Sequence, residues 1–273
     1  MSGVAGSLKC SALVGLALIA ACSKEPIELG ITDYSERAGP ICAVGERLGE
    51  GGVHDDEQTD GRIRYSVRTP ANYDPAVAHP LLVVYAGAGH SRGASERFTD
   101  LTSISTTAGF IVAYADHRRL STKVLDDLAT IPAAIAQNWC INLEKVFLTG
   151  HSDGGTAAAA MAFRQDDGLD PAGIAPSAAG VSGQDLMMYQ CPENLRVMVL
   201  HNHDDELFLG FGATAAEWWA NCNRCETSKK VKGADGCLDY NRCPENGKVR
   251  YCEADGGHRR WPGINRAMLE FFL

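Results

Sequence analysis

The chain has 273 residues, of which 45% are hydrophobic and 22% are charged. These proportions are typical of a globular protein and exclude wholesale disorder and a multi-span membrane protein. The formal net charge is −9 and no long block of basic residues occurs, so nucleic acid is not an expected partner. One sizeable domain with a buried core fits this length.

The first residues carry the pattern of an export signal. Lys9 is the only charged residue before an apolar run at 12–21, which is too short to span a bilayer but has the length of a signal-peptide core. We therefore expect residues 1–21 to be removed on export. The run ends in Ile-Ala-Ala-Cys, which resembles the lipobox of bacterial lipoproteins and predicts lipid attachment at Cys22. A lipid anchor to the membrane of the cell envelope, with the outer membrane as the expected location, follows from this pattern; the alternative is an extracellular protein cut nearby.

Ten cysteines are unusual for a chain of this length. Subtracting Cys10 in the signal and Cys22 at the lipid site leaves eight, an even number that predicts up to four disulfides in an oxidising compartment. Cys222 and Cys225 also have the spacing of a zinc knuckle or a redox pair, but export favours structural disulfides. Spacing alone assigns no pairing. The disulfide candidates are Cys42, Cys140, Cys191, Cys222, Cys225, Cys237, Cys243 and Cys252.

Residues 22–61 are rich in Gly, Glu and Asp and have little apolar periodicity, which predicts a tether and an irregular segment. The folded domain is expected over 62–273. Its strands are predicted at 62–67, 81–85, 110–114, 146–148, 173–178, 197–200 and 249–251, and its helices at 124–138, 156–161, 213–220 and 264–272. Strands that alternate with helices predict an α/β fold, with a mostly parallel sheet between two helical layers. Functional residues are expected beyond the C-terminal ends of its strands.

The strongest motif is Gly-His-Ser-Asp-Gly-Gly at 150–155, between a predicted strand and an alanine-rich helix. This is the context of a nucleophile elbow, in which glycines let neighbouring backbone pass close to a strained serine. The motif predicts Ser152 as a nucleophile and the N–H of Asp153 as an oxyanion donor. His151 is not expected to be the base, because adjacent side chains on such a turn diverge.

A nucleophile of this kind requires a base and an acid, which follow it in the chain order serine, acid, histidine. His258 comes after two glycines and a strand-like segment, and it precedes the last helix. A flexible loop can therefore deliver its imidazole, and His258 is the candidate general base and acid.

The acid is expected in the loop that follows the strand at 197–200. A buried carboxylate there would orient the imidazole, and position alone leaves three candidates open. These are Asp204, Asp205 and Glu206. The less favoured interpretation of this loop is a metal site, in which His201 and His203 bind a divalent ion with the adjacent carboxylates.

From about Arg62 onward the sequence resembles secreted α/β-hydrolase esterases of the polyhydroxybutyrate depolymerase and feruloyl esterase type. The specific matches are the motif at 150–155 and Gly-Gly-His followed by Trp-Pro-Gly at 261–263. The acid of this family lies in a His-Gly-Thr-x-Asp loop, and its register over 201–205 selects Asp205. The resemblance implies an α/β-hydrolase fold, here braced by disulfides.

The loop at 86–89 departs from the family pattern. It reads Ala-Gly-Ala-Gly, where relatives usually have His-Gly-x-Gly, and the resemblance implies that the N–H of Gly87 or Ala88 is the second oxyanion donor. The segment from 116 to 124 is also short, whereas many relatives have a substrate loop with Trp and Cys there.

The resemblance implies a serine esterase that hydrolyses a carboxylic ester, small or polymeric, through an acyl-enzyme. No cofactor and no metal are expected, because Ser-His-Asp chemistry needs neither. A peptidase of the prolyl-oligopeptidase type shares the triad order but normally carries a large accessory domain. The alternative from another class is a non-catalytic surface binding protein on the same fold.

Overall fold

The computed structural model describes residues 42–43, 45–164, 169–192, 195–233 and 235–273. The expected signal peptide, the lipid site at Cys22 and most of the tether lie outside these residues. Within the described ranges, no helix combines the length and the apolar character needed to cross a membrane.

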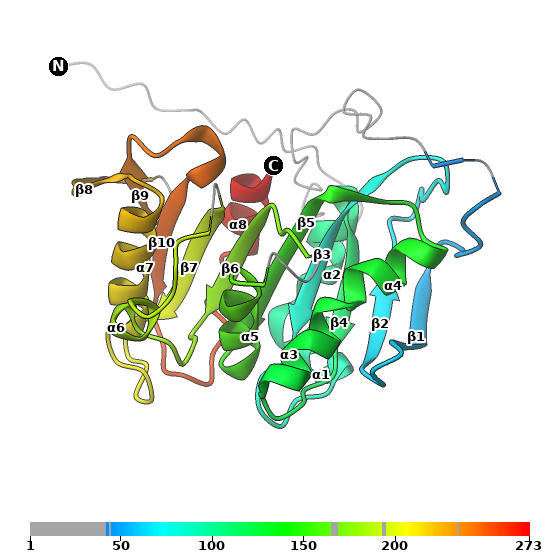
Figure 1. Cartoon of the computed structure of the whole chain (residues 1–273), viewed down its shortest axis with the longest axis horizontal. Helices are drawn as coiled ribbons and strands as arrows, with labels where there is room; N and C mark the ends of the chain where they lie inside the picture. Colours follow the sequence, from blue (N-terminus) through cyan, green and yellow to red (C-terminus); the bar gives the residue numbers. More distant parts are fainter. Residues whose placement is uncertain (1–41, 44, 165–168, 193–194, 234) are drawn as a thin grey trace, which may run out of the picture. The chain divides into compact units, whose positions relative to one another are not determined.

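The described residues form a ten-stranded sheet in the order β1-β2-β4-β3-β5-β6-β7-β10-β9-β8 (Figure 1). The centre from β4 to β10 is parallel, and antiparallel pairs form both edges. The strands are β1 (Val53–Gln58), β2 (Arg64–Arg68), β3 (His79–Tyr85), β4 (Ile111–Ala115), β5 (Ile141–His151), β6 (Gly173–Ser177), β7 (Arg196–Asn202), β8 (Glu226–Lys232), β9 (Leu238–Asn241) and β10 (Val249–Ala254).

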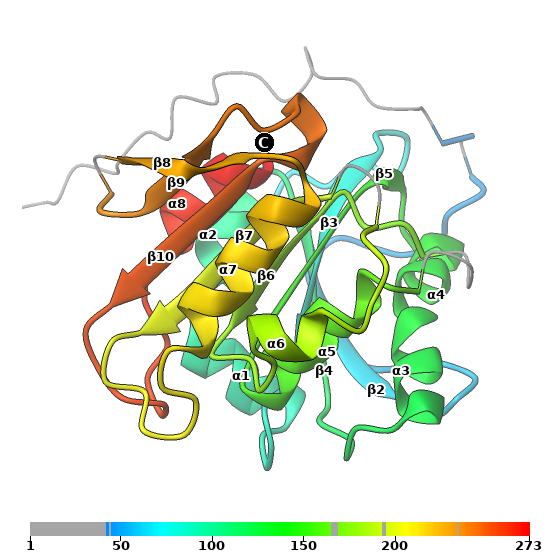
Figure 2. The same cartoon turned by 60° about the vertical axis from the view of Figure 1, so that its left-hand side comes forward.

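Helices cover both faces of this sheet, as the alternating pattern predicted. In Figures 1 and 2, α3 (Thr122–Ala129), α4 (Ile131–Asn138), α5 (Asp153–Met161), α6 (Gly183–Leu186) and α7 (Phe211–Cys222) lie on one side, and α2 (Thr102–Thr107) and α8 (Asn265–Phe272) lie on the other. The end of α1 (Arg92–Thr99) is joined to the start of α8, because Asn265 Nδ2 donates to the Thr99 carbonyl at 2.8 Å.

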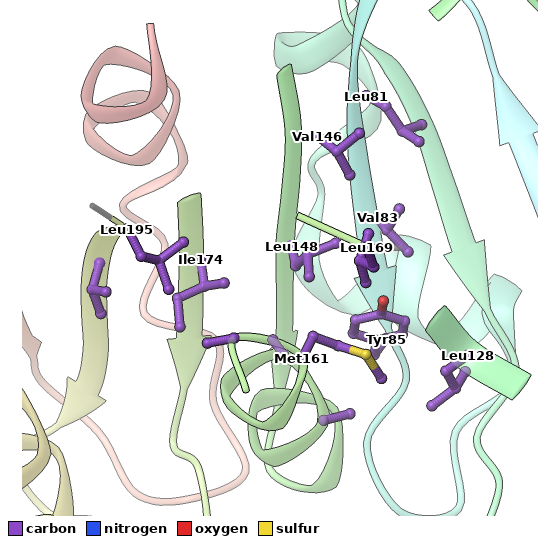
Figure 3. Close-up of a cluster of buried hydrophobic side chains, with 14 of the residues drawn as sticks. Leu81, Val83, Tyr85, Leu128, Val146, Leu148, Met161, Leu169, Ile174 and Leu195 are labelled. Carbon is purple, nitrogen blue, oxygen red and sulfur yellow. The ribbon is translucent and has the colours of Figure 1, made fainter. Parts of the chain in front are cut away.

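The central strand β3 is buried along its whole length. Its Leu-Leu-Val-Val run has no polar alternation because both faces of a parallel sheet are covered. Leu81, Val83 and Tyr85 are two residues apart and share one face. Together with Leu148 of β5 they belong to the core around Met161 of α5 (Figure 3).

The helix predicted at 124–138 is divided into α3 and α4 at Thr130. Pro132 causes the break, since it has no N–H to donate and its ring would clash with the carbonyl four residues earlier. In the first turn of a new helix neither problem arises. The chain therefore ends one helix and begins another at this point.

The segment before Arg62 differs from the irregular structure expected there, because β1 joins the sheet ahead of the expected start of the domain. The strand is mostly exposed and charged, so it shows no apolar alternation. Pairing with β2 and an ion pair between Asp55 and Arg68 (2.7 Å) hold it in place. Such support comes from a partner strand and leaves no local signal.

All eight cysteines expected to form disulfides are paired. The bonds are Cys42–Cys140, Cys191–Cys222, Cys225–Cys243 and Cys237–Cys252. Cys222 and Cys225 have different partners, so they form neither a redox pair nor a zinc knuckle. Cys191–Cys222 ties the segment before β7 to the end of α7, and Cys225–Cys243 closes the base of the β8–β9 hairpin. Cys237–Cys252 ties this hairpin to β10, which leads directly to His258.

Two of these disulfides, removed one at a time, are expected to destabilise the protein to different extents, with the larger loss for the bond that closes the longer loop. Replacing Cys237 and Cys252 by alanine, which opens a separation of 15 residues, is expected to lower the free energy of unfolding by about 3 kcal/mol. Removing Cys42–Cys140, with a separation of 98 residues, is expected to lower it by about 5 kcal/mol. Urea titration of the two double variants measures both values, and a larger loss for the shorter loop would contradict the chain-entropy account.

Candidate active site

Ser152 lies between β5 and α5 with φ 58° and ψ −120°. A positive φ is costly for a residue with a side chain and persists only where the surroundings enforce it. Here the Ser152 N–H donates to the Ser177 carbonyl of β6 at 2.9 Å, and the Ser152 carbonyl accepts from the Thr156 N–H at 2.8 Å. Ser152 therefore has the backbone of a nucleophile elbow at the C-terminal end of β5.

Glycines make the tight packing of this turn possible. A Cβ atom on Gly150 would lie 2.6 Å from the Tyr85 carbonyl oxygen, and a Cβ on Gly154 would lie closer still to the same atom. Neither separation is sterically allowed, so only glycine lets the elbow rest against the end of β3.

Ser152, His258 and Asp205 meet although they come from three separate loops. His258 Nε2 lies 2.8 Å from Ser152 Oγ, and His258 Nδ1 lies 2.9 Å from Asp205 Oδ2. A carboxylate only accepts, so Nδ1 carries the proton and Nε2 accepts from the serine hydroxyl. The loops of Asp205 and His258 follow β7 and β10, which are parallel neighbours (Figure 2).

Asp205 is fully buried, and each of its oxygens has a partner. Oδ1 accepts the N–H groups of Leu207 (3.0 Å) and Phe208 (2.9 Å), while Oδ2 accepts from His258. Burial alone would raise the pKa of Asp205, but the hydrogen bonds from His258 and from the backbone hold this pKa below its ordinary value. The buried carboxyl group therefore remains ionised.

The two other acid candidates have different contacts. Asp204 pairs with His203 Nδ1 at 2.9 Å on the surface, and both side chains are largely exposed. Glu206 Oε2 accepts the main-chain N–H of His258 at 2.9 Å. Of the three candidates, the structure brings only Asp205, the residue that the family register selects, to the imidazole.

The backbone N–H groups that the sequence predicted as oxyanion donors, those of Gly87, Ala88 and Asp153, belong to the elbow and to a loop packed against it. A Cβ atom on Gly87 would be 2.9 Å from the His151 carbonyl oxygen and 3.7 Å from Ser152 Cβ, which places this loop against the elbow. In the part of the chain that the structure describes, the N–H groups of Gly87 and Ala88 donate to no other group. Asp153 is the first residue of α5, so its N–H has no partner within the helix.

His151, which was not expected to contribute to the site, is buried against His258. Its Nε2 lies 2.6 Å from the His258 carbonyl oxygen, and its Nδ1 lies 2.9 Å from Ser177 Oγ. Burial lowers the pKa of His151 to about 4, although the hydrogen bond to His258 acts in the opposite direction. No local sequence pattern reveals these contacts of His151, because both hydrogen-bond partners come from other parts of the chain.

Replacing His151 by glutamine is expected to reduce the amount by which the free energy of unfolding falls in acid. The unfolded imidazole binds a proton below its ordinary pKa of 6.5, whereas the folded one stays neutral down to a pKa of about 4. Stability therefore falls as the pH drops through this window, by about 3 kcal/mol. Urea midpoints of the wild type and the variant at pH 4 and pH 7 measure the difference. An identical pH dependence in both proteins would show that His151 has no part in it.

His201 and His203, the two histidines of the metal-site interpretation, do not share a site. His201, the last but one residue of β7, is 2% exposed, and its Nε2 lies 3.8 Å from Asp205 Oδ2. The strand ends at Asn202, so the following His203 turns to the surface, where its side chain is 71% exposed. Among the residues that the structure covers, no group of three or more His, Cys, Asp or Glu could hold a metal ion.

The strand order, the helical layers and the elbow after β5 together define an α/β-hydrolase fold. No protein-family model matches the sequence, and no curated protein matches it. The chain is similar in fold to solved structures of low sequence identity.

Three solved structures illustrate this similarity. Acetyl xylan esterase from Aspergillus awamori has a TM-score of 0.62 at 14% identity, with 81% of this chain and 99% of that chain covered. The fluorophosphonate-binding serine hydrolase FphF of Staphylococcus aureus has a TM-score of 0.58 at 14% identity, covering 82% and 100%. Thermogutta terrifontis esterase 2 has a TM-score of 0.56 at 13% identity, covering 83% and 92%. At these identities the similarity establishes the fold alone.

Proposed function

We propose that this chain is an exported serine hydrolase that cleaves carboxylic esters, with Ser152 as nucleophile, His258 as base and acid, and Asp205 as the orienting carboxylate. The observation that carries the proposal is the pair of hydrogen bonds from Ser152 through His258 to Asp205. They join residues 106 and 53 positions apart in the sequence. Packing has no need for three such polar side chains at one point, whereas acyl transfer uses this arrangement.

In the proposed reaction the Ser152 hydroxyl attacks the ester carbonyl while His258 Nε2 takes the hydroxyl proton. The buried Asp205 carboxylate stabilises the imidazolium that forms and keeps the proton on Nδ1. Collapse of the tetrahedral intermediate breaks the bond to the alcohol, which receives the proton from His258. Water then attacks the carbonyl of the acyl-enzyme while His258 Nε2 takes a proton from it. The second tetrahedral intermediate collapses, the acid is released, and Ser152 Oγ receives the proton from His258.

The negative oxygen of the tetrahedral intermediate is stabilised by the backbone N–H groups of Asp153 and of Gly87 or Ala88. Among the described residues these N–H groups donate to no other group, so no hydrogen bond has to break as the charge develops. The N-terminus of α5 adds the positive end of its dipole at the same point.

The family resemblance and the names of similar structures support the proposed substrate class. Two of the three compared proteins are named as esterases and the third as a serine hydrolase. The motif resemblance favours esters of the polyhydroxybutyrate or feruloyl kind. We propose a carboxylic ester substrate on this basis, as a small molecule or as an accessible bond of a polymer.

The test measures hydrolysis and covalent labelling of the same protein. The residue 22–273 protein is expected to hydrolyse p-nitrophenyl acetate or butyrate, methyl ferulate or soluble 3-hydroxybutyrate oligomers, and to react with a fluorophosphonate. Mass spectrometry is expected to place the phosphonyl group on Ser152. Absence of both hydrolysis and labelling would overturn the proposal. Cleavage of Gly-Pro-p-nitroanilide without ester hydrolysis would identify a peptidase instead.

Export and anchoring are proposed from the cysteines. Four disulfides are typical of proteins that mature in an oxidising compartment. We propose lipid attachment at Cys22 after removal of residues 1–21. Expression with an alkyne fatty acid tests the attachment: the wild type is expected to incorporate the label into the membrane fraction, whereas Cys22→Ser is not. Equal labelling of both proteins would contradict the assignment.

A further inference from the structure

The main chain around His258 is held by three side chains, two from the end of β7 and its following loop and one from the elbow. Asn202 Nδ2 donates to the carbonyl oxygens of Gly257 (3.0 Å) and Arg260 (2.6 Å). Glu206 accepts the His258 N–H, and His151 Nε2 lies 2.6 Å from the His258 carbonyl oxygen. The position of an imidazole depends on its backbone as well as on its side-chain torsions, so these contacts, together with the Asp205 hydrogen bond, set where His258 Nε2 lies relative to Ser152.

The direction of the His151 hydrogen bonds follows from their partners. A carbonyl oxygen only accepts, so His151 Nε2 carries the proton that is donated to His258. In a neutral imidazole Nδ1 is then an acceptor, and the Ser177 hydroxyl at 2.9 Å must donate to it. Burial keeps His151 neutral by lowering its pKa to about 4. The His258 carbonyl thus selects the tautomer of His151, and the Ser177 hydroxyl satisfies the remaining ring nitrogen of that tautomer.

Ser177 is also bonded to the other half of the site, because its carbonyl oxygen accepts the N–H of Ser152 at 2.9 Å. One residue at the end of β6 therefore supports the nucleophile through its main chain and, through His151, the backbone of His258. His151 is 8% exposed and lies in ring contact with Phe98 and Trp261. This packing restricts the ring to the orientation that both hydrogen bonds require.

We propose that His151 is a positioning residue for the reaction: its Nε2–H holds the carbonyl group of His258, and the Ser177 hydroxyl holds the ring in place by donating to its Nδ1. The inference rests on the proposed function. It assigns His151 no contact with substrate and no proton transfer. A displacement of about 1 Å at a reacting group can lower a rate about 10²-fold, which sets the size of the expected effect.

The test compares two replacements at this position by the rate at which a fluorophosphonate labels Ser152. Leucine leaves the buried His258 carbonyl without a donor, whereas glutamine can present an N–H at a similar reach. His151→Leu is expected to label about 10- to 100-fold more slowly than the wild type. His151→Gln is expected to recover most of this loss. With an ester substrate the loss is expected in kcat, with KM changed less than about threefold.

A variant at Ser177 tests the same inference if His151→Leu does not fold. Ser177→Ala keeps the carbonyl that supports Ser152 but removes the donor to His151 Nδ1, and it is expected to label several-fold more slowly. Circular dichroism and melting temperature establish that each variant is folded at the assay temperature. An unchanged rate in Ser177→Ala would show that the Ser177 hydroxyl has no part in holding His151.

The outcomes separate this inference from the proposed function. If the wild type is labelled at Ser152 but His151→Leu is labelled equally fast, the positioning role is wrong and the proposed function stands. If His151→Leu and His151→Gln are equally slow, the ring acts by packing and the donor role is wrong. If the wild type is not labelled at all, the proposed function fails and the inference fails with it.

Discussion

Ser152→Ala is expected to lower kcat for ester hydrolysis by about a millionfold, the effect typical of removing the nucleophile from a serine hydrolase. No other hydroxyl lies within hydrogen-bond distance of His258 Nε2 among the residues that the structure describes. Without Ser152 the imidazole can only activate water, which lacks the orientation that the elbow provides. Active-site titration and initial rates on p-nitrophenyl butyrate measure the loss.

A matched control is Ser228→Ala, which removes an exposed serine of β8. Its activity is expected to equal that of the wild type. Ester hydrolysis by Ser152→Ala at the wild-type rate would mean that another nucleophile acts, and the proposed mechanism would then be wrong.

Asp205→Asn is expected to lower kcat by about 10⁴-fold, with a smaller effect on KM. The amide keeps the size of the side chain but replaces an acceptor with a group that can donate. It can therefore favour the tautomer of His258 that carries its proton on Nε2, which cannot accept the proton of Ser152. The loss of negative charge also leaves the imidazolium without its buried counter-ion. Steady-state kinetics near neutral pH measure both constants.

Asp204→Asn is the control for this prediction, because it makes the same chemical change one residue away. Its carboxylate pairs with His203 on the surface, and exposed ion pairs contribute little. Activity close to that of the wild type is expected. A large loss of activity in Asp204→Asn together with an active Asp205→Asn would mean that Asp204, and not Asp205, is the carboxylate that orients His258.

The buried central strands were predictable because their signal is local. The run at 81–85 consists of aliphatic residues and a tyrosine, a composition that favours a strand covered on both faces. The motif at 150–155 was equally informative, since a serine flanked by glycines between a strand and a helix is a local pattern, although the backbone that excludes larger residues belongs to β3 and β6. In both cases the signal lies within the segment itself.

The edges of the sheet were not predictable in the same way. β1 and β8 are largely exposed and rich in charged residues, so their apolar pattern is weak. They are strands because a neighbouring strand accepts and donates their hydrogen bonds. The pairing of the cysteines has the same origin, since spacing does not determine which thiols meet.

The sequence by itself determined the alternation of strands and helices, the elbow around Ser152 and an even set of cysteines suited to export. These features depend on periodicity, turn chemistry and composition, which are properties of short segments. Position in the sequence left three carboxylates open and the family register selected Asp205, but only the tertiary structure showed that this carboxylate reaches His258 and that His151 contacts the His258 carbonyl. Those contacts join residues that are 53 and 107 positions apart, and they exist because parallel strands bring their C-terminal loops to one edge of the sheet.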